Sequence, residues 1–319
     1  AIGPAILVIL ASVLCVYLLR AKGSPTHTRF LAGYIIAVVI LALNYIIRDL
    51  WLHPLSALVT YPLASGVILG IAMLVHFSYR FPTTLYPRAR RIVPNLYLLV
   101  ACVALVTDFI LAHAKGAVYL PTSHHYSYQS HPFLAVTMFS GFVIAITVFF
   151  RKSYRYAGRP GVVSWLIGPL PPNARSAKYF GIVTLGSLIV SLSFVLSVSE
   201  MISYTLFNHL FNFGSLIIVL LYFVVYSVAS PEYSSVQQKL IGVSMATVLV
   251  VLGVCAILLF DAVERRFDDE RLRQSKAVVA RAFQVPSLAL SSGVEYIARV
   301  DEVEPGSGYR YRLTRDRKS

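Results

Sequence analysis

The chain has 319 residues, of which 57% are hydrophobic and only 13% are charged. Soluble domains carry about 25% charged residues, so this composition excludes an ordinary soluble domain and indicates that lipid surrounds much of the chain. The net charge of +14 would suit a nucleic-acid-binding protein. Most of the basic residues, however, stand in short loops between apolar segments, and we therefore expect no nucleic-acid partner.

Eight apolar segments follow one another, each close to the ~20 residues that a helix needs to cross the hydrocarbon core of a bilayer. They are residues 2–19, 30–47, 54–79, 92–112, 132–150, 179–199, 204–229 and 238–260. Backbone amides inside lipid must be hydrogen-bonded within their own segment, which favours helices. Pro62 lies inside the third segment and predicts a kink there. The sequence thus predicts an all-α polytopic membrane bundle with about eight spans.

The distribution of lysine and arginine predicts how these helices are oriented. Fourteen stand on one face: Arg20, Lys22, Arg29, Arg80, Arg88, Arg90, Arg91, Arg151, Lys152, Arg155, Arg159, Arg175, Lys178 and Lys239. Up to residue 260, the opposite face has only Arg48 and Lys115. Because basic loops stay in the cytoplasm, the fourteen mark the inner face and the N-terminus lies outside. The apolar stretch 162–170 is too short to span, and we expect it to lie in the inner interface.

The sequence changes character after residue 260. Residues 261–319 hold ten of the 14 acidic residues, and the alternating segments 294–300 and 309–314 flank a turn and predict a β-hairpin. An even number of crossings places this tail outside, and we expect it to be the start of an extracytoplasmic α+β domain that continues beyond residue 319. The predicted domains are a seven-helix membrane bundle (1–230), an eighth transmembrane helix (231–262) and this small, incomplete α+β extension (263–319).

Catalytic and cofactor signatures do not appear in the sequence. Nucleophile-elbow, phosphate-loop and zinc-protease motifs are all absent, and whether the chain is part of an enzyme stays open. The three cysteines are isolated in apolar segments, and the histidines lack the spacing of metal ligands. No lysine stands in mid-span, which excludes a retinal Schiff base. We therefore expect neither a metal nor another cofactor.

Polar side chains within the spans are the stronger clue to function, because they are costly in lipid and usually face a cavity or another helix. Six of them gather toward the predicted outer ends of the helices: Asn44, Asp108, Glu200, Asn208, His209 and Asn212. They predict a binding site, open to the outside, for a small-molecule or peptide ligand. Two alternatives remain open: amides that hydrogen-bond between packed helices, and the ordinary polarity of a membrane interface.

Three short motifs carry a family resemblance. The first segment ends in the basic loop LLRAKGSPTHTRF, the second ends in ALNYIIRDLW, and the third closes on HFSYRFP. With these motifs, residues 1–230 resemble the N-terminal seven-transmembrane sensor region of bacterial histidine kinases and related signalling proteins. The resemblance implies a receptor in the bacterial inner membrane that controls a kinase, cyclase or phosphatase domain absent from this chain. The eighth span and the outer tail depart from that pattern.

The sequence therefore favours a sensor: a bundle in the lipid bilayer that binds its ligand from the extracytoplasmic side. A homodimer is compatible with this interpretation. A transporter or channel is the first alternative, and it would need a continuous polar path, inverted repeats or broken helices. The second alternative is a scaffold subunit of a larger membrane complex, in which the tail is the docking piece.

Overall fold

The computed structural model describes most of the chain up to residue 229. The described residues are 2–20, 26–51, 53, 55–120, 125–128, 131–158, 161–198, 201–229 and the single positions 244, 247, 251 and 273. The chain divides into two compact units, Ala1–Ile257 and Leu258–Ser319. All described residues except Arg273 belong to the first unit. Apart from those single positions, the predicted eighth span and the predicted tail domain lie outside the described residues.

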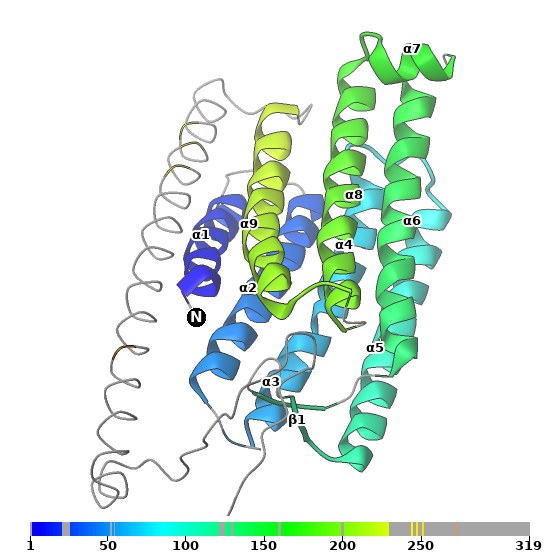
Figure 1. Cartoon of the computed structure of the whole chain (residues 1–319). Helices are drawn as coiled ribbons and strands as arrows, with labels where there is room; N and C mark the ends of the chain where they lie inside the picture. The colour runs from blue at the N-terminus through cyan, green and yellow to red at the C-terminus, as the bar shows by residue number, and fades with distance from the viewer. Residues whose placement is uncertain are drawn as a thin grey trace, which may run out of the picture. The chain divides into compact units, whose positions relative to one another are not determined.

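The described part of the first unit is almost entirely helical (Figure 1). Its elements are α1 (Ile2–Arg20), α2 (Thr26–Leu50), α3 (Ser56–Ser65), α4 (Val67–Arg80), α5 (Ala89–Lys115), β1 (Val118–Leu120), β2 (His125–Ser127), α6 (Pro132–Tyr156), α7 (Val162–Ile167), α8 (Pro172–Val198) and α9 (Tyr204–Ala229). A helix occupies each of the first seven predicted spans, with α3 and α4 sharing the third.

The predicted helical membrane bundle is confirmed in its coarse form. Among the described residues, six stretches are helical, long and apolar enough to cross a membrane: His27–Arg48, Ser56–Arg80, Ala89–Lys115, Pro132–Tyr156, Pro172–Ser197 and His209–Val228. The apolar part of α1, Pro4–Leu19, is shorter than these six. The total of eight spans stays a prediction.

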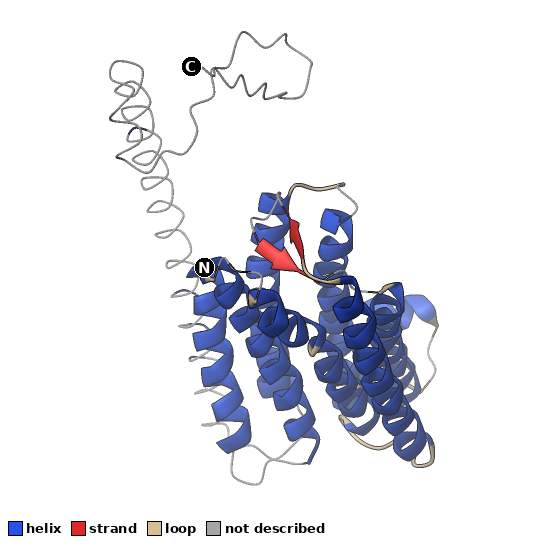
Figure 2. Ribbon diagram, turned by 90° about the horizontal axis from the view of Figure 1, so that it is seen from below, coloured by secondary structure: helices blue, strands red, loops and turns tan. Residues whose placement is uncertain are grey.

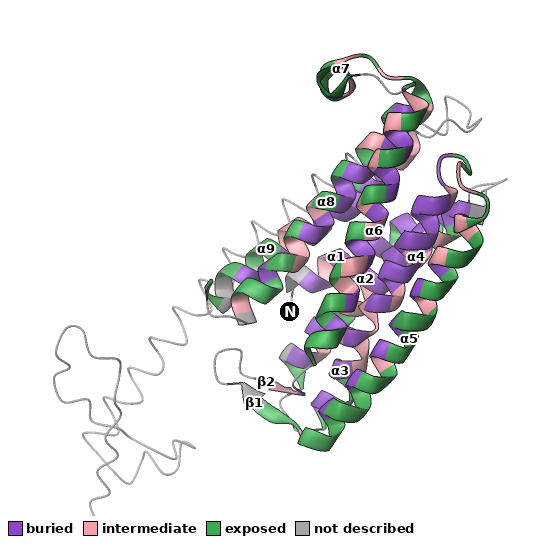
Figure 3. Ribbon diagram, turned by 90° about the vertical axis from the view of Figure 1, so that its right-hand side faces the viewer, coloured by how far each residue is buried: buried purple, intermediate pink, exposed green. Residues whose placement is uncertain are grey.

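Neighbouring helices pack in a closed circuit within the described part of the chain. Contacts join α1 to α2, α2 to α4, α4 to α6, α6 to α8, α8 to α9, and α9 back to α1. Buried residues, purple in Figure 3, gather on the inner sides of these helices, and the core includes Ile71, Leu74, Phe77 and Phe180. Helix α5 lies outside the circuit against α4 and α6, and its outer face carries exposed apolar side chains suited to lipid.

The third predicted span is interrupted at Gly66, four residues after Pro62, where α3 ends and α4 begins. Proline has no backbone N–H, so it cannot complete the helical hydrogen bond to the preceding turn. Helix α3 ends at Ser65, and the N–H of Gly66 donates to the carbonyl of Pro62 at 2.9 Å. The next bond, from the N–H of Leu69 to the carbonyl of Gly66, spans only three residues, so the helix restarts as α4 after a single tight turn.

Between α5 and α6 the chain forms a short antiparallel strand pair that the sequence did not predict. Val118 pairs with Ser127, Tyr119 with Tyr126, and Leu120 with His125 (Figure 2). Strand β2 also contacts α2 and α3, so the loop folds back over the ends of these helices. Within the apolar stretch 162–170, the structure has the short helix α7.

Candidate functional site

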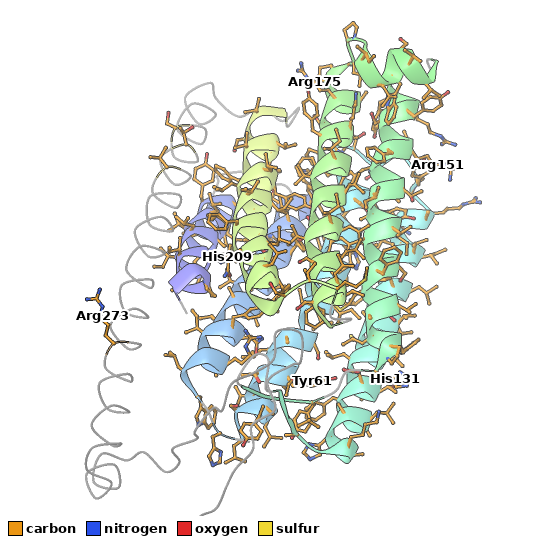
Figure 4. All side chains as sticks on the ribbon, in the orientation of Figure 1. Tyr61, His131, Arg151, Arg175, His209 and Arg273 are labelled. Atoms are coloured by element: carbon orange, nitrogen blue, oxygen red, sulfur yellow. The ribbon has the colours of Figure 1, made fainter. Side chains whose placement is uncertain are left out.

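The six predicted site residues do not form one cluster. Asp108 on α5 and Asn44 on α2 are buried, and Asn212 on α9 is half-buried. His209 is exposed on the outer surface of α9 (Figure 4). The backbone of Asn208 belongs to α9, but its side chain and the whole of Glu200 lie outside the described part of the structure. The remaining three divide between two places, with Asp108 at one and the two asparagines at the other.

Asp108 joins three helices at the predicted outer end of the bundle. The hydroxyl of Tyr61, on α3, donates to one carboxylate oxygen, and the backbone N–H of His131 donates to the other at 2.6 Å. His131 is the N-cap of α6, so the carboxylate also faces the positive end of that helix dipole. Tyr61 and His131 lie at this same end in Figure 4. Both carboxylate oxygens therefore accept a hydrogen bond, and Asp108 links α5 to α3 and to the start of α6.

The ring of Tyr128, in the loop between α5 and α6, packs beside the hydrogen bonds of Asp108. It packs edge-on against Tyr61, with ring centroids 5.5 Å apart, and against His113 at 5.7 Å. Tyr128 is buried although it lies in a loop. The side chains of His113 and Tyr128 therefore serve packing at this end of the bundle.

Asn44 and Asn212 differ from Asp108, because each has a buried amide oxygen with no hydrogen-bond partner among the described residues. The residue Asn44 is only 5% exposed. A buried polar atom without a partner costs about 1–3 kcal/mol. Such an atom is therefore uncommon in a native structure and marks a place where another molecule can supply a donor.

Contacts between α2 and α9 place these two amides at the same height. The rings of Tyr34 and Tyr222 meet at 5.3 Å, and those of Tyr45 and Phe211 meet at 4.7 Å. Eleven residues separate the two contacts on either helix, and the helices run in opposite directions, so one residue forward on α2 matches one residue back on α9. Asn44 precedes Tyr45 and Asn212 follows Phe211, so both amides lie at one level. They are turned to opposite sides of the α2–α9 contact, Asn44 toward α4 and Asn212 toward α1.

An aromatic cluster adjoins the two amides. Tyr45, Phe207 and Phe211 are buried together, and Leu41 and Ile202 pack against them. The guanidinium of Arg48 lies 4.3 Å from the centre of the Tyr45 ring. Because Arg48 is itself buried, this cation stands next to the apolar cluster rather than in open solvent. We call Asn44, Arg48, Tyr45, Phe211 and Asn212 the outer α2–α9 site.

Polar contacts continue along α9 toward the predicted inner end. The hydroxyl of Tyr222 donates to Thr184 at 3.0 Å and accepts from Ser187 at 3.3 Å, both on α8. One turn further, the hydroxyls of Tyr226 and Thr28 are 2.6 Å apart. Helix α9 is therefore tied to α2 and α8 at successive levels below the outer α2–α9 site.

Lys152 is the buried cation that the sequence did not single out. It has no exposed surface, and its ammonium donates to the carbonyls of Tyr79 at 3.0 Å, Phe81 at 2.8 Å and Thr83 at 3.0 Å. Lysine has three N–H donors, and each finds an acceptor at the end of α4. The sequence counted Lys152 among the topological charges. Its spacing from the buried Phe149 continues the buried face of α6, and this spacing could have revealed it.

His76, in the motif at the end of the third span, is buried and stacks on Phe30 with ring centroids 4.9 Å apart. Its Nδ1 lies 2.9 Å from the guanidinium of Arg80, which can only donate. His76 therefore accepts with Nδ1 and is neutral.

Metal-binding geometry is absent from the described residues, where no three histidine, cysteine, aspartate or glutamate side chains converge. Cys15 is a buried free thiol and Cys102 an exposed one. The third cysteine, Cys255, lies outside the described part of the chain.

Comparison with known proteins gives no match: no protein-family model, no curated protein and no solved structure is significantly similar to the chain. The likeness to seven-helix sensor regions stays a prediction, and the functional proposal rests on the geometry of the outer α2–α9 site.

Proposed function

We propose that the chain is the membrane-embedded receptor region of a bacterial signal-transduction protein. In this proposal a small polar ligand enters from the extracytoplasmic side and binds at the outer α2–α9 site. The observation that carries the proposal is the pair of buried amide oxygens, on Asn44 and Asn212, that lack partners among the described residues. The output that the ligand regulates belongs to a part of the protein outside this chain.

The chemistry of the site defines the ligand class. Amide oxygens accept hydrogen bonds, so the ligand must supply donors, such as hydroxyl, amine or amide N–H groups. The aromatic rings of Tyr45 and Phe211 offer an apolar wall for the rest of the molecule.

The contacts below the site give the ligand a route to the inner end. A ligand that binds the Asn44 amide next to Tyr45 and Phe211 stabilises one spacing of α2 and α9, and it shifts the conformational equilibrium only as far as it prefers that spacing. The hydrogen bonds of Tyr222 and Tyr226 connect the same helix α9 to α8 and α2 nearer the inner face. A change in the position of α9 at the outer site would therefore also change its contacts with α8 and α2 near the inner face.

Cysteine accessibility tests whether the site opens to the outside. In a background with the three native cysteines changed to serine, Asn212→Cys and Asn44→Cys are treated with a membrane-impermeant thiosulfonate from the outer side of sealed membranes. We expect the thiol at the half-buried position 212 to react readily and the thiol at the buried position 44 to react more slowly. The matched control, Ser187→Cys on the hydrogen-bonded middle level of α8, should not react. Unreactive thiols at both amide positions, with normal reaction after denaturation, would refute an externally open site.

Ligand binding is tested on the purified chain in nanodiscs with a panel of amino acids, nucleosides and monosaccharides. A compound of the proposed class raises the midpoint of thermal unfolding of the native chain and loses this effect in Asn44→Leu. The same compound should not accumulate in proteoliposomes. Solute-specific uptake would instead establish a transporter and overturn the receptor proposal.

A further inference from the structure

Helix α7 is held against the bundle by three hydrogen bonds, one from the side chain of Trp165 and two from the side chain of Lys178. The indole N–H of Trp165 donates to the hydroxyl of Ser153 at 2.9 Å, and its ring packs edge-on against Phe150 at 5.8 Å. The ammonium of Lys178 donates to the carbonyls of Trp165 at 3.1 Å and Leu166 at 2.6 Å, the last turn of α7. The short helix therefore has a defined position between α6 and α8.

The opposite face of α7 is apolar and exposed. Val162, Val163, Leu166 and Ile167 are 53–84% exposed, and no residue of α7 is buried (Figure 3). Helix α7 runs across the ends of α6 and α8 (Figure 1). If α6 and α8 cross the membrane, α7 lies parallel to its plane, as interfacial amphipathic helices do.

The surroundings of α7 are uniformly basic. The segment 151–178 has six lysine and arginine residues, and the sequence has no aspartate or glutamate between Asp108 and Glu200. Arg175 is exposed and extends outward from α8 near α7, and Arg151 is exposed lower on α6, with its guanidinium 5.7 Å from the centre of the Tyr86 ring (Figure 4). The chain has no carboxylate of its own in this segment to balance these charges, so an external anion is the complementary partner.

We infer that α7 is a membrane-docking helix whose apolar face inserts among acyl chains while the arginines around it bind acidic phospholipid headgroups. The position of Trp165 favours lipid over a protein partner. Its ring contacts Phe150, the last apolar residue before the basic run of α6, and thus lies at the boundary between hydrocarbon and headgroups, where tryptophan is enriched. A helix held at that level has its exposed aliphatic side chains next to the bilayer.

The two tryptophans of the chain make a direct test possible. Trp51→Phe leaves Trp165 as the single fluorescent reporter on α7. The full chain is placed in nanodiscs of phosphatidylcholine alone, or of equal phosphatidylcholine and phosphatidylglycerol, with part of the phosphatidylcholine brominated near the headgroup end of its acyl chains. Bromine quenches Trp165 only if α7 lies in the bilayer, and iodide in the buffer quenches it only if α7 faces water.

We expect stronger bromine quenching in the acidic nanodiscs, and we expect this difference to shrink in 1 M salt, where the screening length falls to about 3 Å. Each arginine removed near an anionic surface lowers attachment about fivefold. Arg151→Gln combined with Arg175→Gln should therefore abolish the difference between the two lipid mixtures. The matched control, Arg88→Gln with Arg91→Gln, removes two exposed charges of another basic loop and should leave it unchanged.

Two results would overturn the inference. Equal bromine quenching in both lipid mixtures would show that α7 inserts without any contribution from acidic headgroups. Quenching by iodide but not by brominated lipid would show that the apolar face of α7 points into water, where a protein partner would cover it. A folding defect is detected separately, as a lower midpoint of thermal unfolding in the same nanodiscs.

Discussion

Replacing Lys152 by methionine removes the ammonium that holds the end of α4. Its three carbonyl acceptors then lose their donor. Thr83 is exposed, so water can replace the lysine there, but Tyr79 and Phe81 are buried. An orphaned buried carbonyl costs about 1–3 kcal/mol, or about 2–6 kcal/mol for two. The methionine no longer has a buried charge to desolvate, which offsets part of this loss. We expect a net decrease of about 2–4 kcal/mol in the free energy of unfolding.

Lys178→Met is the matched control, since Lys178 also donates to two carbonyls from the same segment of the chain. Its side chain is half-exposed, so water can replace it and the cost is about 0.5–1 kcal/mol. For a bundle of this size 1 kcal/mol corresponds to about 2–4 °C in the unfolding midpoint. Heating in detergent, followed by near-ultraviolet circular dichroism, should therefore show a drop of about 5–12 °C for Lys152→Met. Equal drops in the two variants would refute the reasoning.

Other residues give predictions that the same unfolding assay checks. Asp108→Ala removes the acceptor of two hydrogen bonds and should cost about 2–4 kcal/mol, while Tyr61→Phe removes one donor and should cost about half as much. Tyr222→Phe loses a hydroxyl in the bundle interior and should cost only about 0.6 kcal/mol, so a loss several times larger would contradict the prediction. At Gly141 a Cβ would overlap neighbouring side chains, so Gly141→Val should cost about 1–3 kcal/mol, whereas Gly161→Ala, in open space, should be neutral.

The helices could be predicted from the sequence because a helix that crosses a bilayer needs about 20 apolar residues, and the length of an apolar segment is read directly from the sequence. All seven of the first predicted spans coincide with helices, and the third is interrupted at Gly66, four residues after Pro62. The strand pair at β1 and β2 was missed because three residues on each side give too little alternation to exceed the turn signals around them. Its position depends on contacts with α2 and α3, which no local pattern contains.

The candidate site could be predicted only in part. The sequence shows which polar residues lie near the outer ends of the helices, but it does not show which of their side chains come into contact. Asp108 and Asn44 have similar positions in the sequence pattern, yet Asp108 is engaged by Tyr61 and His131, whereas the amide oxygen of Asn44 has no partner among the described residues. Pairing across 47 residues depends on how α3 and α5 pack. Lys152 was misjudged for the opposite reason: its charge matched the positive-inside pattern, although its side chain is buried.

Hydroxyl and amide side chains differ in how easily they find a hydrogen-bond partner inside a membrane helix. Within the spans, several hydroxyls donate to the carbonyl four residues earlier in their own helix: those of Thr60, Thr137, Thr184, Ser187 and Ser191. An amide oxygen cannot donate, and it needs a donor from elsewhere. If Asn44 were adhesive between helices, Asn44→Leu would destabilise the ligand-free bundle. Because its oxygen is instead unpaired, we expect Asn44→Leu to leave the unfolding midpoint unchanged or to raise it, while ligand binding is lost. A midpoint several degrees lower would assign Asn44 to helix packing.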